Sequence, residues 1–223
     1  MKISPTLTEV KEIAKTGKYN ILPVSCEILS DFITPIEAMR ILRNVSTHCY
    51  LLESAQANEA WGRYTFLGYD PKLEINCIDG HMKLGKLSVE TENPSEYIRQ
   101  ILSEYKSPKF DYLPSFTGGL VGYFSYDYLG YKEKSIRGKA RDTEDFKDVD
   151  LMLFDKVIAF DNLCQKIILI ANMSLDAPET GYNKAIVELK QLRELLMHGE
   201  KKQNMGGKLL GEVTPLFDKE QYC

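Results

Sequence analysis

One short segment of the 223-residue chain combines side chains that could bind a small amino acid. Leu51-Leu52-Glu53-Ser54 places an acidic and a hydroxyl side chain directly after an apolar pair, at the expected end of a strand. A carboxylate and a hydroxyl are charge-assisted acceptors that can receive an ammonium group. The same residues also fit a solvated turn with a local bond from Ser54 to the backbone. The residues alone leave both interpretations open.

Two further side chains near aromatic residues could take part in binding. Arg63 lies between Trp61 and Tyr64 and could hold a carboxylate, although a guanidinium resting on a neighbouring ring is the commoner arrangement. Tyr126 closes an aromatic segment at residues 116–127, which a buried sheet explains equally well.

Motifs for metal, phosphate or nucleophilic chemistry are missing from the sequence. The three histidines lack zinc spacing, and the five cysteines contain no C-x-x-C pair, so we interpret the cysteines as reduced core thiols. The glycines at 118, 119 and 122 precede a strand pattern and therefore do not fit a phosphate loop. Glycines in a strand indicate a bulge or a close backbone approach.

The composition is that of an ordinary soluble globular protein. The chain has 28 basic and 32 acidic side chains, a formal net charge of −4, and 43% hydrophobic residues. Neither a nucleic acid nor an anionic membrane is an expected partner, because no basic run is present. No apolar stretch approaches the roughly 18 residues of a membrane span, and no signal peptide pattern opens the chain. We expect a cytoplasmic protein.

Four helices are predicted by their start signals and apolar spacing. Capping boxes begin at Thr6 and Thr34, and we expect Asn93 and Asp176 to cap two more helices, the last spanning residues 181–198. Strand patterns cover the following ranges: 22–28, 49–54, 63–69, 73–78, 82–89, 116–127, 151–160 and 166–173. Pro23 predicts that the first of these lies at a sheet edge.

This order of elements predicts an α+β fold. Helices alternate with strand pairs, and two hairpins are expected, at Asp79-Gly80 and at residues 161–164. A mainly antiparallel sheet fits this pattern better than a parallel βαβ arrangement does.

The last residues predict a linker and the beginning of another helix. Residues 199–208 are polar and rich in glycine and lysine, and Asp218 opens a further capping box. Helices average about 11 residues, so a start signal this late predicts that the chain was cut from a longer protein.

Several of these segments together resemble the N-terminal domain of anthranilate synthase component I. The resemblance rests on Leu51-Leu52-Glu53-Ser54, on Trp61-Gly62-Arg63-Tyr64-Thr65-Phe66-Leu67-Gly68 and on residues 118–127, Gly-Gly-Leu-Val-Gly-Tyr-Phe-Ser-Tyr-Asp, in this order. It implies a family domain over 1–198, a linker over 199–214 and a truncated start of the chorismate-binding domain over 215–223. It also implies two packed, roughly orthogonal sheets flanked by helices.

The resemblance implies a regulatory role for this part of the protein. In the family, the full-length lyase converts chorismate and ammonia from glutamine to anthranilate and pyruvate, in tryptophan biosynthesis. The missing domain binds chorismate and Mg²⁺, so this part alone is expected to be inactive and to hold no metal. Glu53, Ser54 and Leu52 are carried over as the feedback site for L-tryptophan, with Arg63 and Tyr126 as further candidates.

Partners and alternatives follow from the same resemblance. The expected partners are the chain's own C-terminal chorismate-binding domain and a glutamine amidotransferase subunit, component II. Aminodeoxychorismate synthase component I, whose N-terminal half is homologous, is an alternative. A free-standing amino-acid-binding module is another.

Overall fold

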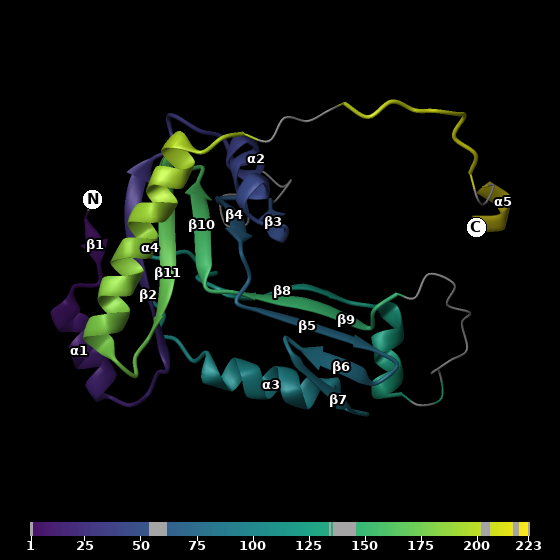
Figure 1. The fold of residues 1–223 in the computed structure, drawn as a ribbon, viewed down its shortest axis with the longest axis horizontal. Coiled ribbons are helices and arrows are strands. Elements are labelled where there is room, and N and C mark those ends of the chain that lie inside the picture. Colours follow the sequence, from purple (N-terminus) through teal and green to yellow (C-terminus); the bar gives the residue numbers. More distant parts are fainter. Residues whose placement is uncertain are drawn as a thin grey trace.

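The computed structural model describes residues 2–53, 62–133, 135, 146–201, 206–215 and 219–222. They form two antiparallel sheets with helices alongside (Figure 1). The six-stranded sheet contains, in spatial order, β1 (Ile3–Ser4), β2 (Ile21–Leu29), β11 (Lys166–Ser174), β10 (Lys156–Asp161), β4 (Tyr64–Tyr69) and β3 (Cys49–Leu52). The five-stranded sheet contains β7 (Leu87–Glu90), β6 (His81–Leu84), β5 (Leu73–Ile78), β9 (Val149–Phe154) and β8 (Gly119–Phe124).

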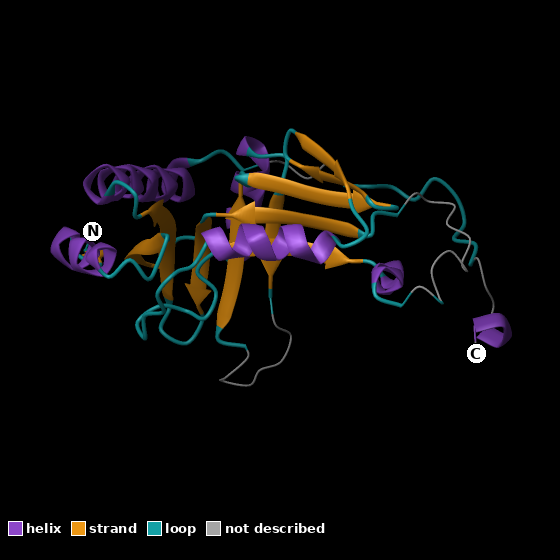
Figure 2. Cartoon of the chain, turned by 90° about the horizontal axis from the view of Figure 1, so that it is seen from below, coloured by secondary structure: helices purple, strands orange, loops and turns teal. Residues whose placement is uncertain are grey.

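Helices flank both sheets, which confirms the predicted α+β class. The long helix α4 (Pro178–His198) covers one face of the six-stranded sheet together with α1 (Leu7–Lys15) and α2 (Pro35–Val45). Helix α3 (Pro94–Glu104) packs on the five-stranded sheet through Ile98. A 3₁₀ helix, η1 (Tyr126–Tyr131), follows β8, and a short α5 (Lys219–Tyr222) is the last element (Figure 2).

The two sheets are joined by a bent two-stranded ribbon. β4 continues into β5 through Asp70–Lys72, and β9 continues into β10 through Asp155. The same two segments of the chain therefore pair antiparallel on both sides of the bend. In Figure 1 the strands of the two sheets run at a large angle to each other. The prediction of one strand over 151–160 was therefore wrong, because Asp155 separates two strands that belong to different sheets.

Polar contacts hold this bend in place. The Nδ2 group of Asn172 donates to the backbone oxygens of Thr117 at 2.6 Å and Asp155 at 3.0 Å. The Lys156 ammonium lies 2.8 Å from an Asp70 carboxylate oxygen, and this ion pair links the two segments of the ribbon. The Asn172 side chain thus supplies hydrogen bonds to backbone oxygens at the bend, where the ladder of one sheet ends and that of the other begins.

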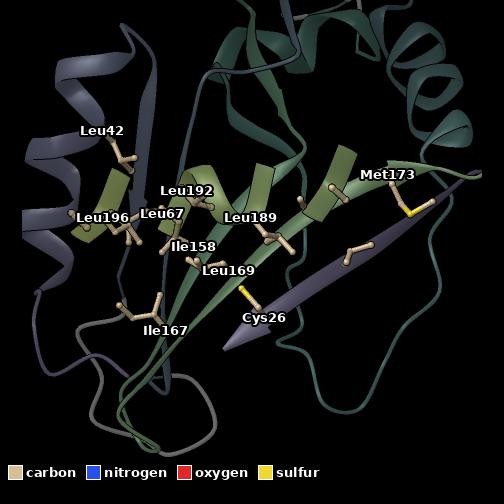
Figure 3. Close-up of a cluster of buried hydrophobic side chains, with 14 of the residues drawn as sticks. Cys26, Leu42, Leu67, Ile158, Ile167, Leu169, Met173, Leu189, Leu192 and Leu196 are labelled. Carbon is tan, nitrogen blue, oxygen red and sulfur yellow. The ribbon is translucent and has the colours of Figure 1, made fainter. Parts of the chain in front are cut away.

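The main core lies between the six-stranded sheet and its helices (Figure 3). Leu189 and Leu192 of α4 contact the sheet beside Leu169, and all three are almost completely buried. A second cluster, around Ile75 and Met82, supports the five-stranded sheet. Each sheet therefore has its own hydrophobic support.

Three of the four helices begin where predicted, and the fourth begins earlier. Thr6 and Thr34 both make reciprocal capping boxes with the acid three residues on. Asn93 is the N-cap residue of α3, but its side chain makes no cap hydrogen bond, because its Oδ1 atom accepts from the Ser95 hydroxyl at 2.7 Å instead. Asp176 accepts from the Ser174 hydroxyl at 2.7 Å, and α4 begins at Pro178, three residues before the predicted start.

The remaining differences have local causes. The predicted strand over 82–89 is a hairpin of β6 and β7, because Gly85 adopts φ +59° and reverses the chain. The prediction that Pro23 lies on an edge strand was wrong, because β2 lies between β1 and β11. Among the described residues, however, β1 pairs only with Ser25 and Cys26, so no strand lies beside Pro23 on the side away from β11. Cys26 and Cys77 are buried as expected, whereas Cys164 is exposed in the β10–β11 turn.

Candidate functional site

The candidate amino-acid site begins at the end of an edge strand. β3 is the outermost strand of its sheet, and Leu52 is its last residue. Both Leu52 and the following Glu53 are exposed. Ser54 and Trp61 lie outside the described residues, so the structure places two of the three principal candidates.

Leu52 faces an aromatic surface of the sheet. Side chains alternate along a strand, and Cys49 and Leu51 pack on the main core, so Tyr50 and Leu52 point to the opposite face. There Leu52 pairs across the strands with Phe66, which contacts Phe116 edge-on with ring centroids 5.7 Å apart. The end of β3 therefore offers an apolar, aromatic wall beside an exposed carboxylate.

Tyr50 carries an unusual polar group on this face. Its ring is 8% exposed and lies edge-on to Phe154 at 4.7 Å between centroids. The hydroxyl is buried and has no hydrogen-bond partner among the described residues. Burial also raises the pKa of the Tyr50 hydroxyl well above its ordinary value, so the group stays protonated.

Arg63 is bound to a carboxylate from the same chain. Its guanidinium donates to Asp161 through Nε at 3.1 Å and through Nη2 at 2.6 Å, and it lies over the Tyr64 ring at 4.9 Å. The backbone N–H groups of Leu163 and Cys164 also donate to Asp161, at 3.2 and 3.0 Å. Asp161 is 4% exposed, and the arrangement is a bidentate pair closed by a turn.

Charge and hydrogen bonding keep both members of this pair ionised. The hydrogen bond from Arg63 is the main cause that lowers the pKa of the Asp161 carboxyl, against a smaller opposing effect of burial. The same bond raises the pKa of Arg63. Sequence reasoning missed Asp161, because it follows Arg63 by 98 residues and only the pairing of β4 with β10 brings the two together.

Tyr126 does not lie near Leu52 and Glu53. Leu52 pairs with Phe66 of β4 in the six-stranded sheet. Tyr126 follows Phe124 of β8 in the five-stranded sheet, whose partner Val149 begins β9. β3 and β8 belong to different sheets, on opposite sides of the bend (Figure 1). The Tyr131 hydroxyl, 2.7 Å from both Asp148 and the Gly80 N–H, fixes η1 against the five-stranded sheet.

The described residues provide neither a cluster of metal ligands nor a membrane-spanning helix. They contain no group of three or more His, Cys, Asp or Glu side chains that could hold a metal ion. The helices of the described part are each too short or too polar to cross a bilayer.

The chain belongs to the family of chorismate binding enzymes, whose sequence pattern it matches over residues 47–223. It is 32% identical to anthranilate synthase component 1 of Acetivibrio thermocellus, over 98% of this chain and 46% of that protein. With anthranilate synthase component 1 of Pseudomonas aeruginosa it shares 36% identity, over 84% of this chain and 39% of that protein. The chain thus spans less than half the length of these relatives.

A solved structure also matches part of the chain. Anthranilate synthase component I from Streptococcus pneumoniae aligns with a TM-score of 0.48 and 25% identity, over 74% of this chain and 36% of that one.

Proposed function

We propose that this chain is the N-terminal, regulatory part of an anthranilate synthase component I. The similarity to the A. thermocellus protein, over 98% of this chain and 46% of that relative, supports an anthranilate synthase component I. The assignment to its N-terminal part rests on the resemblance of residues 51–54, 61–68 and 118–127 to that domain. The full-length protein would convert chorismate and ammonia to anthranilate and pyruvate in tryptophan biosynthesis. In this proposal the catalytic domain would lie outside the present chain, which alone would not form anthranilate.

The regulatory ligand would be L-tryptophan, bound at the end of β3. Glu53 is exposed there and can receive the ammonium group, and Leu52 beside Phe66 offers an apolar wall for the indole ring. Ser54 is the third residue assigned to this site. Arg63 remains a further candidate, but its guanidinium already holds Asp161 and would have to serve both carboxylates.

Inhibition would act between the two halves of the full-length protein. Tryptophan bound at their seam would favour an arrangement with lower affinity for chorismate, which is a coupling free energy between two sites and not occlusion of one. The other half would complete the tryptophan site and bind Mg²⁺. A glutamine amidotransferase subunit, component II, would supply ammonia to the full-length protein.

Replacement of Ser54 by phenylalanine tests the regulatory site. In the full-length protein, Ser54→Phe should retain anthranilate formation and lose inhibition by tryptophan. Ser88→Phe is the matched control, because Ser88 is an exposed serine on β7 of the other sheet, and its inhibition should be unchanged. Unchanged inhibition in Ser54→Phe would refute the assignment.

A further inference from the structure

A surface groove of about 410 Å³, which we call the α1 groove, is lined by α1 and by the segment that precedes β8. α1 follows β1, which is the outermost strand of the six-stranded sheet on the side opposite β3 (Figure 1). The groove is therefore separate from the candidate tryptophan site. Its main lining side chains are Thr8, Glu9, Glu12 and Ile13 of α1, with Phe110 and Tyr112 of the segment before β8.

Both walls of the α1 groove are anchored in hydrophobic clusters. Val10 of α1 is fully buried in the main core, and Ile13 packs against the same core. On the other wall, Leu113 is 9% exposed and belongs to a buried cluster against which Phe110 packs. The rings of Phe110 and Tyr112 are stacked, with centroids 5.1 Å apart. The fold thus holds an aromatic pair opposite one face of a helix.

Two carboxylates give the α1 groove a negative charge. Oε2 of Glu9 accepts from the backbone N–H and the hydroxyl of Thr6 at 2.7 and 2.8 Å, and these bonds lower the pKa of Glu9. Glu12 pairs with Lys15 through Oε1, but both side chains are well exposed, so water weakens this pair. One oxygen of each carboxylate accepts no bond from the described residues. The described lining contains no lysine or arginine, so the groove favours a cation.

The aromatic wall favours a guanidinium among the possible cations. Tyr112 is 48% exposed, so its ring is accessible from the groove. Burial and the charge of Glu9 raise the pKa of Tyr112 to about 12, and the ring therefore stays neutral near pH 7. A planar guanidinium stacks on an aromatic ring and pairs with carboxylates at the same time, whereas an ammonium is a more strongly hydrated point charge.

The shape of this surface favours an arginine that a protein partner carries. Glu9 and Glu12 are exposed, so the α1 groove is open, whereas a small-molecule pocket buries about 70–90% of its ligand. A second hollow, of about 450 Å³, adjoins the groove and shares Ser4 and Tyr112 with it. Leu113 contributes apolar surface to this second hollow. Two adjoining hollows fit a segment that presents an arginine next to an apolar side chain.

We propose that the α1 groove is the docking site of a partner protein, which inserts an arginine side chain against Glu9, Glu12 and Tyr112 and an apolar neighbour into the second hollow. The inference does not depend on the proposed function, because none of these residues belongs to the candidate tryptophan site. Charge complementarity defines the partner. The contact is small and its charges are exposed, so a short peptide should bind weakly, with a dissociation constant of roughly 1 mM.

A peptide titration followed by ¹⁵N NMR tests the proposal on the 223-residue chain. The probe is acetyl-Leu-Arg-Leu-amide, and we expect saturable shifts of the Glu12, Ile13 and Tyr112 amides. The same peptide with citrulline in place of arginine retains the shape without the charge and should bind about tenfold more weakly. N-acetyl-arginine amide, which lacks the apolar neighbours, should also bind more weakly than the peptide.

Two variants test the assigned contacts. Glu12→Gln and Tyr112→Ser should each weaken peptide binding about threefold. Glu12→Gln should leave the thermal midpoint unchanged, because Glu12 and its partner Lys15 are both exposed, so its weaker binding reports a lost contact. Glu104→Gln is the matched control, since Glu104 is an exposed glutamate at the end of α3, and its binding should equal that of wild type.

Several results would overturn the proposal. The absence of saturable shifts in the α1 groove would do so, as would equal binding of the arginine and citrulline peptides. Equal binding of N-acetyl-arginine amide and the peptide would indicate a site for a small cation instead of a protein segment. A dimer of the 223-residue chain that covers Glu12 and Tyr112 without peptide would make a second copy the occupant.

Discussion

Removal of the Arg63 charge should destabilise the protein through Asp161. Arg63→Met retains most of the stem over Tyr64 and removes the guanidinium, which donates two hydrogen bonds to a carboxylate that is only 4% exposed. The backbone donors of Leu163 and Cys164 remain. The variant therefore leaves a buried negative charge with half of its donors and without its counter-charge.

The size of the effect follows from the burial of the two partners. Loss of one partner of a buried ion pair costs about 3–5 kcal/mol. Because the Arg63 side chain is 36% exposed and water can reach it, we expect a smaller loss, about 2–3 kcal/mol of unfolding free energy. At roughly 2–4 °C per kcal/mol for a chain of this size, the thermal midpoint should fall by about 5–10 °C.

Urea unfolding of the 223-residue chain at pH 7 measures this loss. The matched control is Lys166→Met, which breaks a pair with Glu27 on the same sheet whose side chains are 43% and 52% exposed; it should cost less than about 1 kcal/mol. Equal losses for the two variants would refute the reasoning about the buried carboxylate.

The pH dependence supplies an independent check. The pKa of Asp161 is lowered in the folded state, so its stabilisation is present above the unfolded value of about 3.9 and is lost as the pH falls through the folded value. The difference in stability between wild type and Arg63→Met should therefore narrow below about pH 4. A difference that stays constant from pH 7 to pH 3 would contradict the assigned ionisation.

Three further substitutions test the packing, each by urea unfolding of the 223-residue chain. Gly122→Ala should cost about 3 kcal/mol, because its Cβ would lie 1.9 Å from the Asp150 carbonyl oxygen at φ +153°; a loss below 1 kcal/mol would contradict this close approach. Gly68→Ala should cost about 2 kcal/mol, since its Cβ would meet the Tyr50 ring at 2.2 Å. Tyr50→Phe should raise stability by about 1 kcal/mol, because it removes a buried hydroxyl that has no partner among the described residues, and destabilisation would reveal a partner for that hydroxyl.

Features encoded by neighbouring residues could be predicted from the sequence. The capping boxes at Thr6 and Thr34 involve residues three positions apart, and both form. The hairpin at Asp79-Gly80 follows equally from local turn preferences, with both residues at positive φ. These predictions succeed because the competing tertiary contacts do not change the local geometry.

Features set by distant contacts could not be predicted. Residues 151–160 were predicted as one strand, yet at Asp155 the chain passes from one sheet to the other. A contact with the distant Asn172 holds this change, and no turn signal marks it. The partner of Arg63 was missed for the same reason. For the candidate site, the sequence predicted that Leu52 and Glu53 lie near the end of a strand, and Leu52 is the last residue of β3. It could not predict that Tyr126 lies beside the other sheet, because that position depends on the pairing of the strands.

The central claim is that this chain is the regulatory part of an anthranilate synthase. The most direct measurement is an assay of the protein encoded by the complete reading frame with chorismate, Mg²⁺ and ammonia, in which anthranilate fluorescence is followed with and without L-tryptophan. We predict anthranilate formation that tryptophan inhibits. Consumption of chorismate without fluorescent anthranilate would contradict the claim and indicate an aminodeoxychorismate synthase, and the absence of any turnover would favour an amino-acid-binding module.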